Sequence, residues 1–182
     1  MVHEVNEPAR RIVVSPQAAT RVAVARAALE ELRQGQRLLV LAPTQEAADQ
    51  LVRTVALQQG ALFGVERLML NRLVGMLASG HAAEKGLAFL SRLGARAVAA
   101  RTIFRLRDDP RMAPFSTVST LPGFAAALAA AHQTLKENRV DGSRLRSFGS
   151  PGEALAALLG QFDAELAAAR LLDRAGMLDA AV

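Results

Sequence analysis

The strongest constraint on the fold of this chain is the order of its first segments, which alternate between strand and helix. Residues 37–42, Arg-Leu-Leu-Val-Leu-Ala, form a near-continuous apolar run, which is typical of a strand covered on both faces of a sheet. Pro43 and Thr44 end this run, and Thr44 is placed to cap a helix over residues 45–58. Strand–helix units in this order predict an α/β fold with a parallel sheet and right-handed crossovers.

A similar unit precedes this one, and a third follows it. We expect a strand over residues 11–14, and then a helix over residues 20–32 whose apolar side chains recur at helical spacing. Another strand is expected near residues 61–65, followed by a helix over residues 68–77.

After Ser79-Gly80 the pattern changes to alanine- and leucine-rich helical segments. From Glu84 onwards we find no convincing strand. Helices are predicted over residues 86–107, 121–137, 151–170 and 174–181. We therefore expect an α/β part over residues 1–80 and a helical subdomain over residues 81–182.

Composition excludes several classes of protein. Hydrophobic residues make up 51% of the chain, yet no uninterrupted apolar stretch approaches the roughly 20 residues of a membrane-spanning helix. The N-terminus lacks the apolar core of a signal peptide. The absence of cysteine excludes a disulfide framework and a thiolate metal site. We expect a soluble, cytoplasmic protein without a membrane partner.

The charge of the chain suggests nucleic acid as a partner. The formal net charge is +5, and of the 22 basic residues only Lys85 and Lys136 are lysines. Arginine suits bidentate contact with phosphate better than lysine does. The alternative is a biased codon composition that supplies arginines merely to solvate helices. With no Trp, no Tyr and seven Phe, the chain is poorly supplied with side chains for stacking single-stranded bases.

The first strand–helix junction has the length and position of a phosphate-binding loop. Residues 15–22, Ser-Pro-Gln-Ala-Ala-Thr-Arg-Val, align with the pattern G-x-x-x-x-G-K-[ST]. Ser15 and Thr20 take the glycine positions, Arg21 the lysine position and Val22 the magnesium-binding position. Arg21 keeps the positive charge, whereas Val22 cannot ligate a metal.

This loop and Pro43-Thr44 each have a functional and a plain interpretation. For the loop, an ordinary turn is favoured over ATP hydrolysis, and the middle case is a relic that holds an anion or DNA phosphate through Ser15, Thr20 and Arg21. We expect no cofactor, and ATP with magnesium only if this loop still functions. Thr44 follows a strand at the sheet edge where ligands bind, but the spacing alone favours a capped helix start.

Arginines cluster in the segment after residue 90. Arg92 and Arg96, and likewise Arg101 and Arg105, are four residues apart, so each pair shares a helix face. Together with Arg107 they could lie along a nucleic-acid backbone, and a solvated helix face is the alternative.

No catalytic or metal-binding constellation is evident elsewhere. The three histidines lie far apart in the sequence, and His132 is expected to be a surface or hydrogen-bonded residue rather than a ligand. We predict no metal site and no catalytic residue.

Taken in order, these segments resemble the N-terminal region of UvrD/Rep-like superfamily I helicases. The resemblance is greatest to the B subunit of bacterial ATP-dependent helicase–nuclease complexes. It rests on the loop of residues 15–22, on residues 39–48, on Leu121-Pro122-Gly123-Phe124, and on the ending over residues 171–178. It covers nearly the whole chain, and the order of the segments carries it.

The resemblance implies a RecA-like domain 1A followed by the start of its helical insertion 1B. It matches residues 15–22 to the Walker A loop and Pro43-Thr44 to motif Ia, which contacts single-stranded DNA. The chain departs from the family at both loop glycines and at the lysine and hydroxyl positions. It also stops before any Walker B carboxylate, second RecA-like domain or nuclease motif, so we expect an N-terminal piece of a longer protein.

The implied function is that of a non-catalytic, helicase-like N-terminal domain of a DNA repair and recombination nuclease. Its expected partners are DNA, with single strands included, and a helicase or nuclease subunit. The residues expected to contact phosphate are Arg21, Thr44, Arg92, Arg96, Arg101, Arg105 and Arg107. The alternatives are a divergent ATPase that needs residues beyond 182, and a plain protein-interaction domain.

Overall fold

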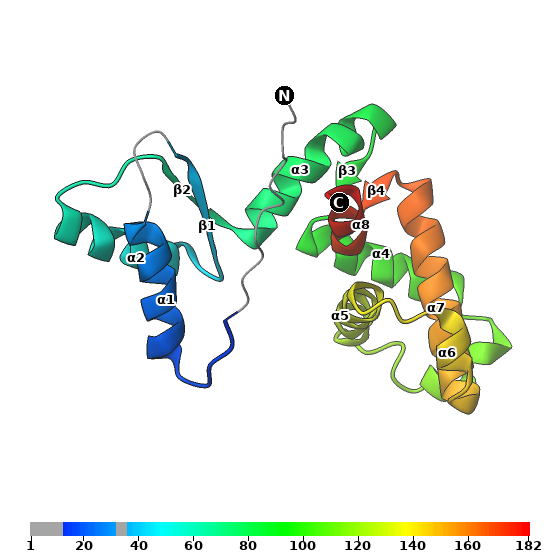
Figure 1. The fold of residues 1–182 in the computed structure, drawn as a ribbon. Coiled ribbons are helices and arrows are strands. Elements are labelled where there is room, and N and C mark those ends of the chain that lie inside the picture. The colour runs from blue at the N-terminus through cyan, green and yellow to red at the C-terminus, as the bar shows by residue number, and fades with distance from the viewer. Residues whose placement is uncertain (1–12, 32–35) are drawn as a thin grey trace, which may run out of the picture. The chain divides into compact units, whose positions relative to one another are not determined.

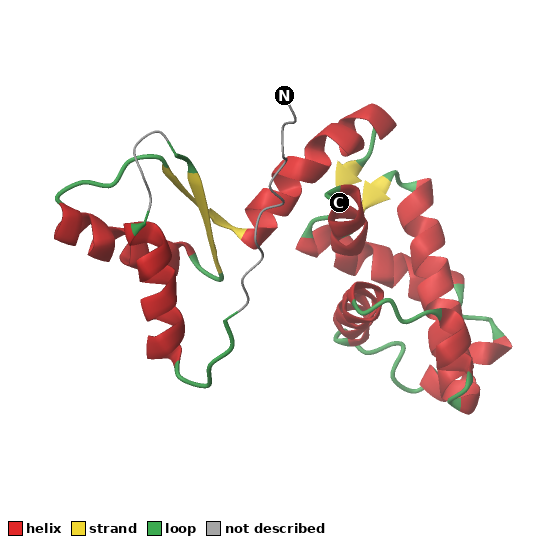
Figure 2. Cartoon of the chain, viewed as in Figure 1, coloured by secondary structure: helices red, strands yellow, loops and turns green. Residues whose placement is uncertain are grey.

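The computed structural model describes residues 13–31 and 36–182 (Figure 1). Helices dominate these ranges, and the strands form two parallel sheets of two strands each (Figure 2). No helix in the described ranges is both long and apolar enough to cross a membrane. The chain divides into two compact units, residues 1–73 (the first unit) and 74–182 (the second unit), which are described in turn.

The first unit pairs two strands and packs two helices against them. Its elements are α1 (Ala18–Glu30), β1 (Leu38–Ala42), α2 (Gln45–Gln59) and β2 (Val65–Met69). The strands run parallel, with Leu38 opposite Val65. Leu29, Val52 and Val55 are buried between the helices and one face of this sheet. The parallel pairing expected from the strand–helix order is thus present.

The strand over residues 37–42 and the helix over residues 45–58 are confirmed, but the expected burial of the strand is wrong. Leu39 and Leu41 remain 42% and 44% exposed, whereas their neighbours in β1 are partly buried. Among the described residues, α1 and α2 cover one face of this sheet. The apolar run of β1 is therefore half-buried.

The predicted third strand is displaced along the chain. It was expected near residues 61–65, whereas β2 begins at Val65, and α3 (Leu70–Lys85) replaces the helix expected over residues 68–77. Gly64 has a φ of +77°, and a Cβ there would overlap the carbonyl oxygen of Gln36. Only glycine therefore fits here, where the backbone just before β2 passes close to the backbone of Gln36.

The first predicted strand lies partly outside the described residues. Residues 11 and 12 are not described, and Val13 and Val14 form no strand. The helix expected over residues 20–32 begins two residues earlier, and its C-cap is Glu31. Of the parallel sheet expected from the sequence, the described residues of the first unit contain the β1–β2 pair.

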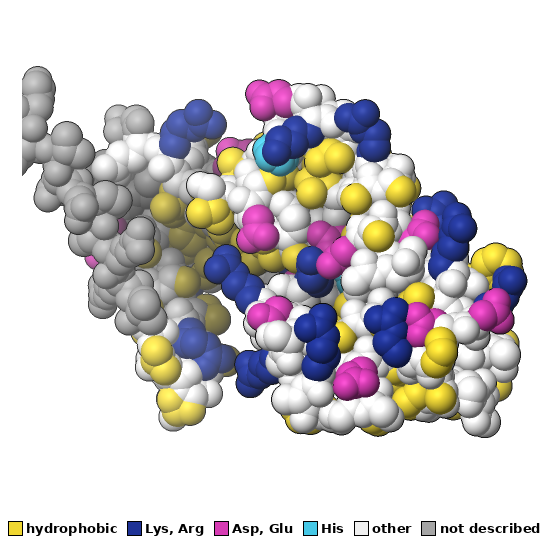
Figure 3. All heavy atoms as spheres, turned by 90° about the vertical axis from the view of Figure 1, so that its right-hand side faces the viewer, with side chains coloured by type: hydrophobic (Ala, Val, Ile, Leu, Met, Phe, Trp, Pro, Cys, Tyr) yellow, Lys and Arg dark blue, Asp and Glu magenta, His cyan; other side chains and the backbone are white. Residues whose placement is uncertain are grey.

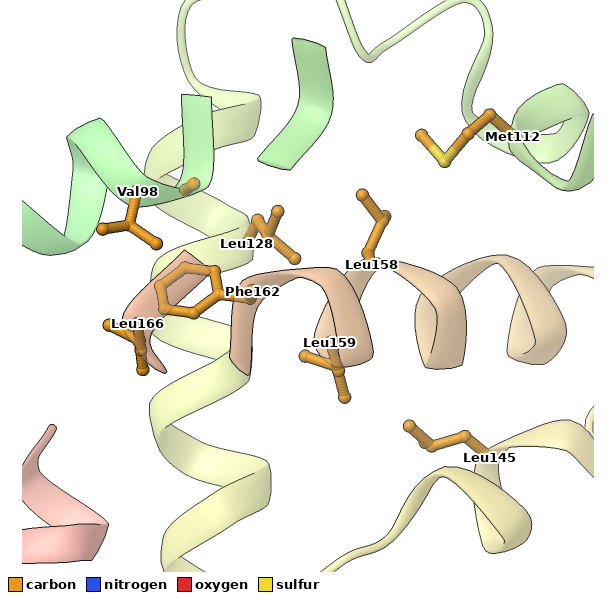
Figure 4. Close-up of a cluster of buried hydrophobic side chains, with 9 residues drawn as sticks. Val98, Met112, Leu128, Leu145, Leu158, Leu159, Phe162 and Leu166 are labelled. Carbon is orange, nitrogen blue, oxygen red and sulfur yellow. The ribbon is translucent and has the colours of Figure 1, made fainter. Parts of the chain in front are cut away.

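The second unit is a helical assembly around one long helix. Besides residues 74–85 of α3, its helices are α4 (Arg92–Arg105), the 3-10 helix η1 (Pro110–Phe115), α5 (Phe124–Glu137), α6 (Gly142–Arg146), α7 (Gly149–Ala168) and α8 (Arg174–Ala180). Helix α7 packs against α4, α6 and η1. Figure 4 shows Val98, Leu128 and Phe162 meeting from α4, α5 and α7 in the core of this unit.

The expectation of no strand after Glu84 is wrong. Two short strands, β3 (Ala88–Phe89) and β4 (Leu171–Leu172), pair in parallel within the second unit. Each has two residues, too few to show a period in the sequence. As a consequence the helix expected over residues 86–107 begins at Arg92, where the Ser91 hydroxyl accepts a hydrogen bond from the Gly94 amide at 3.0 Å.

Candidate nucleic-acid interface

Helix α4 carries four of the five clustered arginines that are predicted to contact phosphate, and Arg107 follows it. Its inner face carries Val98, Ala99 and Thr102, all buried in the second unit. The opposite side of a helix must then face outward, and each of the five arginines from position 92 to 107 is exposed. No acidic residue lies between positions 92 and 107.

Two of these arginines share a buried carboxylate. Glu165 of α7 pairs with the guanidinium of Arg101 and, at 3.6 Å, with that of Arg105. Its side chain is only 8% exposed, and Gln161 donates a further hydrogen bond to it at 3.0 Å. A buried carboxylate needs such partners to offset its lost hydration. Arg101 and Arg105 therefore fasten α4 to α7.

Sequence reasoning missed Glu165. The carboxylate comes from a different helix, about 60 positions further along the chain, so no i,i+4 spacing on α4 reveals it. Acidic residues near Arg101 and Arg105 in the sequence do not indicate that this pair is engaged, because its partner comes from α7.

The remaining three arginines differ in their partners. Arg107 donates to Asp108 at 3.1 Å, and its guanidinium lies 4.1 Å from the ring centroid of Phe104. Within the described residues, Arg92 and Arg96 have no acidic group within ion-pair distance. Figure 3 shows basic side chains lying among acidic ones on the face that it draws. Arg92 and Arg96 are thus left with uncompensated positive charge.

The phosphate-loop residues come together at the start of α1. The Ser15 hydroxyl accepts from the Gln17 amide at 3.2 Å, and the Thr20 hydroxyl donates to the Gln17 side chain at 3.4 Å. The guanidinium of Arg21 donates to the Ser15 carbonyl oxygen. The positive charge of the loop is therefore directed onto the backbone of the loop itself.

The backbone of this loop also lacks one feature of an anion nest. A nest alternates right- and left-handed residues so that successive N–H groups converge. The residues with positive φ in the described ranges all lie elsewhere, none of them between positions 15 and 22. Without glycines, this loop forms a conventional helix start.

Thr44 lies where the sequence placed it, at the end of β1. Its hydroxyl oxygen accepts from the Ala47 amide at 3.2 Å and so caps α2. Glu46 stands in the first turn of α2, where a carboxylate complements the helix dipole. Because the hydroxyl oxygen serves as acceptor in the cap, its own hydrogen is left to donate to another group.

The second unit contains a buried polar cluster around His132 that the sequence did not predict. His132 is 2% exposed and stacks on Phe162 with centroids 4.0 Å apart. Its Nε2 lies 2.8 Å from Asp163, which also accepts from Lys136 at 3.0 Å. His132 is thus the hydrogen-bonded residue that was anticipated. The described residues contain no group of three His, Asp or Glu side chains arranged to hold a metal.

Half-burial acts to raise the pKa of Asp163, but the hydrogen bonds from His132 and Lys136 outweigh it and hold the pKa below its ordinary value. An ionised carboxylate can only accept, so Nε2 of His132 carries the hydrogen in this contact. These hydrogen bonds join α5 to α7.

The predicted contact residues fall in different units. Arg21 and Thr44 belong to the first unit, and the arginines from 92 to 107 belong to the second. Within the second unit, the structure brings Arg101 and Arg105 together on Glu165 and leaves Arg92 and Arg96 free of acidic partners among the described residues.

No protein-family model matches this chain, and no curated protein sequence matches it either.

Proposed function

We propose that this chain is a non-catalytic, helicase-like N-terminal domain of a DNA repair and recombination nuclease. It has a RecA-like first half and a 1B-like helical second half. Its role is to bind or guide a DNA strand and to dock a partner helicase or nuclease subunit.

The observation that carries the proposal is the exposed pair Arg92 and Arg96 on α4. Both lie on one helix face, one turn apart, with no acidic partner among the described residues. Guanidinium groups in this state are suited to phosphate oxygens, which they contact in a bidentate manner. Arg101, Arg105 and Arg107 contribute positive potential from side chains that already hold acidic partners.

The phosphate loop supports a non-catalytic role. A working loop presents a lysine and converging amides to the nucleotide, together with a hydroxyl for magnesium. Here Arg21 is bonded to the Ser15 carbonyl, and an exposed valine stands at the hydroxyl position. In the first unit, the role that we propose for Arg21 and Thr44 is contact with a DNA phosphate.

The experiment is a titration of a fluorescent oligonucleotide by anisotropy at several salt concentrations. Each phosphate contact with a single strand contributes about 0.7 to the slope of log affinity against log salt. We expect the R92Q/R96Q variant to bind more weakly and to lower that slope by about 1.4. The matched control is R53Q/R144Q, which removes the same charge from exposed arginines of α2 and α6.

Three outcomes would contradict the proposal. Equal slopes for the two double variants would show that the α4 arginines do not contact phosphate. A rise in melting temperature with Mg-ATP would favour a divergent ATPase. If the folded wild-type chain did not bind the oligonucleotide, the alternative of a protein-interaction domain would be favoured.

A further inference from the structure

An exposed apolar stripe runs along the outward face of α4. Leu93, Ala97, Ala100 and Phe104 follow one another at intervals of four, three and four residues, and all are exposed. This spacing places them on one side of the helix, opposite the buried residues Val98 and Thr102. We call these four residues the α4 stripe.

The α4 stripe lies between two pairs of arginines. With about 100° of rotation per residue, Arg92 and Arg96 fall on one side of it, and Arg101 and Arg105 on the other. Helix α4 contains no Asp or Glu. Since Glu165 neutralises the second pair, the free positive charge lies along the Arg92–Arg96 side. This surface is complementary to a molecule that carries negative charge and has an apolar face.

Phe104 adds an aromatic surface at one end of the α4 stripe. The guanidinium of Arg107 lies over its ring, and Asp108 holds that guanidinium in turn. Even so, Phe104 is 62% exposed. Unpaired bases stack on aromatic rings and on arginine planes, which makes such a pair a suitable surface for a base.

The dimensions suit a short stretch of nucleotides. Arg96 and Phe104 are eight residues apart, or roughly 12 Å along the helix axis. At the roughly 3.4 Å per nucleotide of one strand in a B-form duplex, this distance corresponds to three or four nucleotides, and a more extended single strand spans it with fewer.

We propose that the outward face of α4 is a platform for single-stranded nucleic acid. An unpaired base stacks against Phe104, and the phosphates of the same strand lie at Arg92 and Arg96. This inference rests on the proposed function and deepens it, because it specifies the strand form that is bound and the residue that selects it. A duplex keeps its bases inside the helix and offers Phe104 no stacking partner, so the platform favours single strands.

The test compares three labelled probes of about 20 nucleotides, longer than a typical single-strand site. They are an oligothymidine, an abasic strand of the same length and a duplex, each titrated by anisotropy with the full chain at one salt concentration. We expect oligothymidine to bind about tenfold more tightly than the abasic strand, since stacking of a base on an aromatic side chain has this magnitude. The variant F104A should lower the affinity for oligothymidine to that of the abasic strand.

Two further variants separate stacking from general effects. F104W retains a flat aromatic surface and should restore the preference for bases. F148A is the matched control, because Phe148 is a 71% exposed phenylalanine of the same unit outside α4, and its loss should change nothing. Since Phe104 is exposed, F104A should keep the circular dichroism spectrum of the wild type.

The outcomes distinguish this inference from the function on which it rests. Equal affinity of the wild type for oligothymidine and the abasic strand would overturn the stacking platform. If the slope of log affinity against log salt still depended on Arg92 and Arg96, the proposed DNA binding would nevertheless be supported. If F104A abolished self-association in light scattering and left the oligonucleotide affinities unchanged, the stripe would be a protein contact and the platform would be overturned. Failure to bind any of the probes would overturn both proposals.

Discussion

The carboxylate of Asp163 has two hydrogen-bond partners that lie about 30 positions earlier in the chain. It accepts from the buried His132 and from Lys136, and the opposite ring nitrogen of His132 lies 3.9 Å from Asp173. Because the pKa of Asp163 is lowered in the folded state, the carboxylate stabilises the fold at pH values above its unfolded pKa of about 4. That contribution is lost as the pH falls through the lower, folded pKa.

We therefore expect D163N to be less stable than the wild type near neutral pH, and the difference to shrink below about pH 4. The side chain is 43% exposed, so solvent screening keeps the charge-dependent part to about 1 kcal/mol or less. Urea unfolding at a series of pH values measures this difference. D179N is the matched control, because its exposed pair with Arg139 at 3.6 Å contributes little. A stability difference for D163N that stayed constant down to about pH 3 would contradict the assignment.

The sequence could predict those features of the candidate site that depend on residues close together in the chain. The i,i+4 rule correctly placed Arg92 with Arg96 on an exposed helix face, and the cap by Thr44 followed from its place after an apolar run. The partners that distinguish one arginine from another come from elsewhere in the chain. Glu165 reaches α4 from another helix, so only the three-dimensional packing shows that Arg101 and Arg105 are engaged.

At the scale of an element, two of the three glycines of α7, Gly152 and Gly160, differ in what surrounds them. A Cβ on Gly152 would overlap the carbonyl oxygen of Leu145, where α6 ends against the first turn of α7. A Cβ on Gly160 would meet nothing within 4 Å. The first glycine is therefore required by close approach, and the second only lowers the helix propensity of α7.

We expect G152A to lower the free energy of unfolding by at least about 2 kcal/mol, since rigid backbone must move. G160A should instead raise it by about 0.5–1 kcal/mol, because alanine is the better helix former. Denaturant unfolding of the two variants beside the wild type provides the comparison. Equal effects of the two substitutions would show that α6 and α7 are not packed as described.

The elements themselves were predictable in proportion to their length and pattern. The helix after Thr44 and the long helices α5 and α7 have enough residues to show a period. The strands β3 and β4 are too short to show a period. They form because residues 88–89 and 171–172, distant in the sequence, pair in the folded chain. The start of β2 depended on Gly64, whose close approach to Gln36 has no signature in a hydrophobic pattern.

At the scale of the whole molecule, the two units have unequal cores. Among the described residues, the buried cluster of the first unit contains Leu29, Val52 and Val55, whereas that of the second unit contains nine buried residues, one of which is Leu158. Stability increases with the apolar area that is buried, and amide exchange reports it locally. The exposed face of β1 at Leu39 and Leu41 adds nothing to the first core.

Hydrogen exchange followed by mass spectrometry should therefore show faster exchange in β1 and α2 than in α5 and α7. Leu29 and Leu158 are each 1% exposed, which makes L29A and L158A a matched pair with one substitution in each core. Removing a buried leucine side chain costs about 2–5 kcal/mol, so exchange should rise by more than tenfold, and most strongly in the unit that carries the substitution. If L29A accelerated exchange in α5 and α7 as much as in β1 and α2, the chain would unfold as one cooperative body, and the division into two units would have no energetic counterpart.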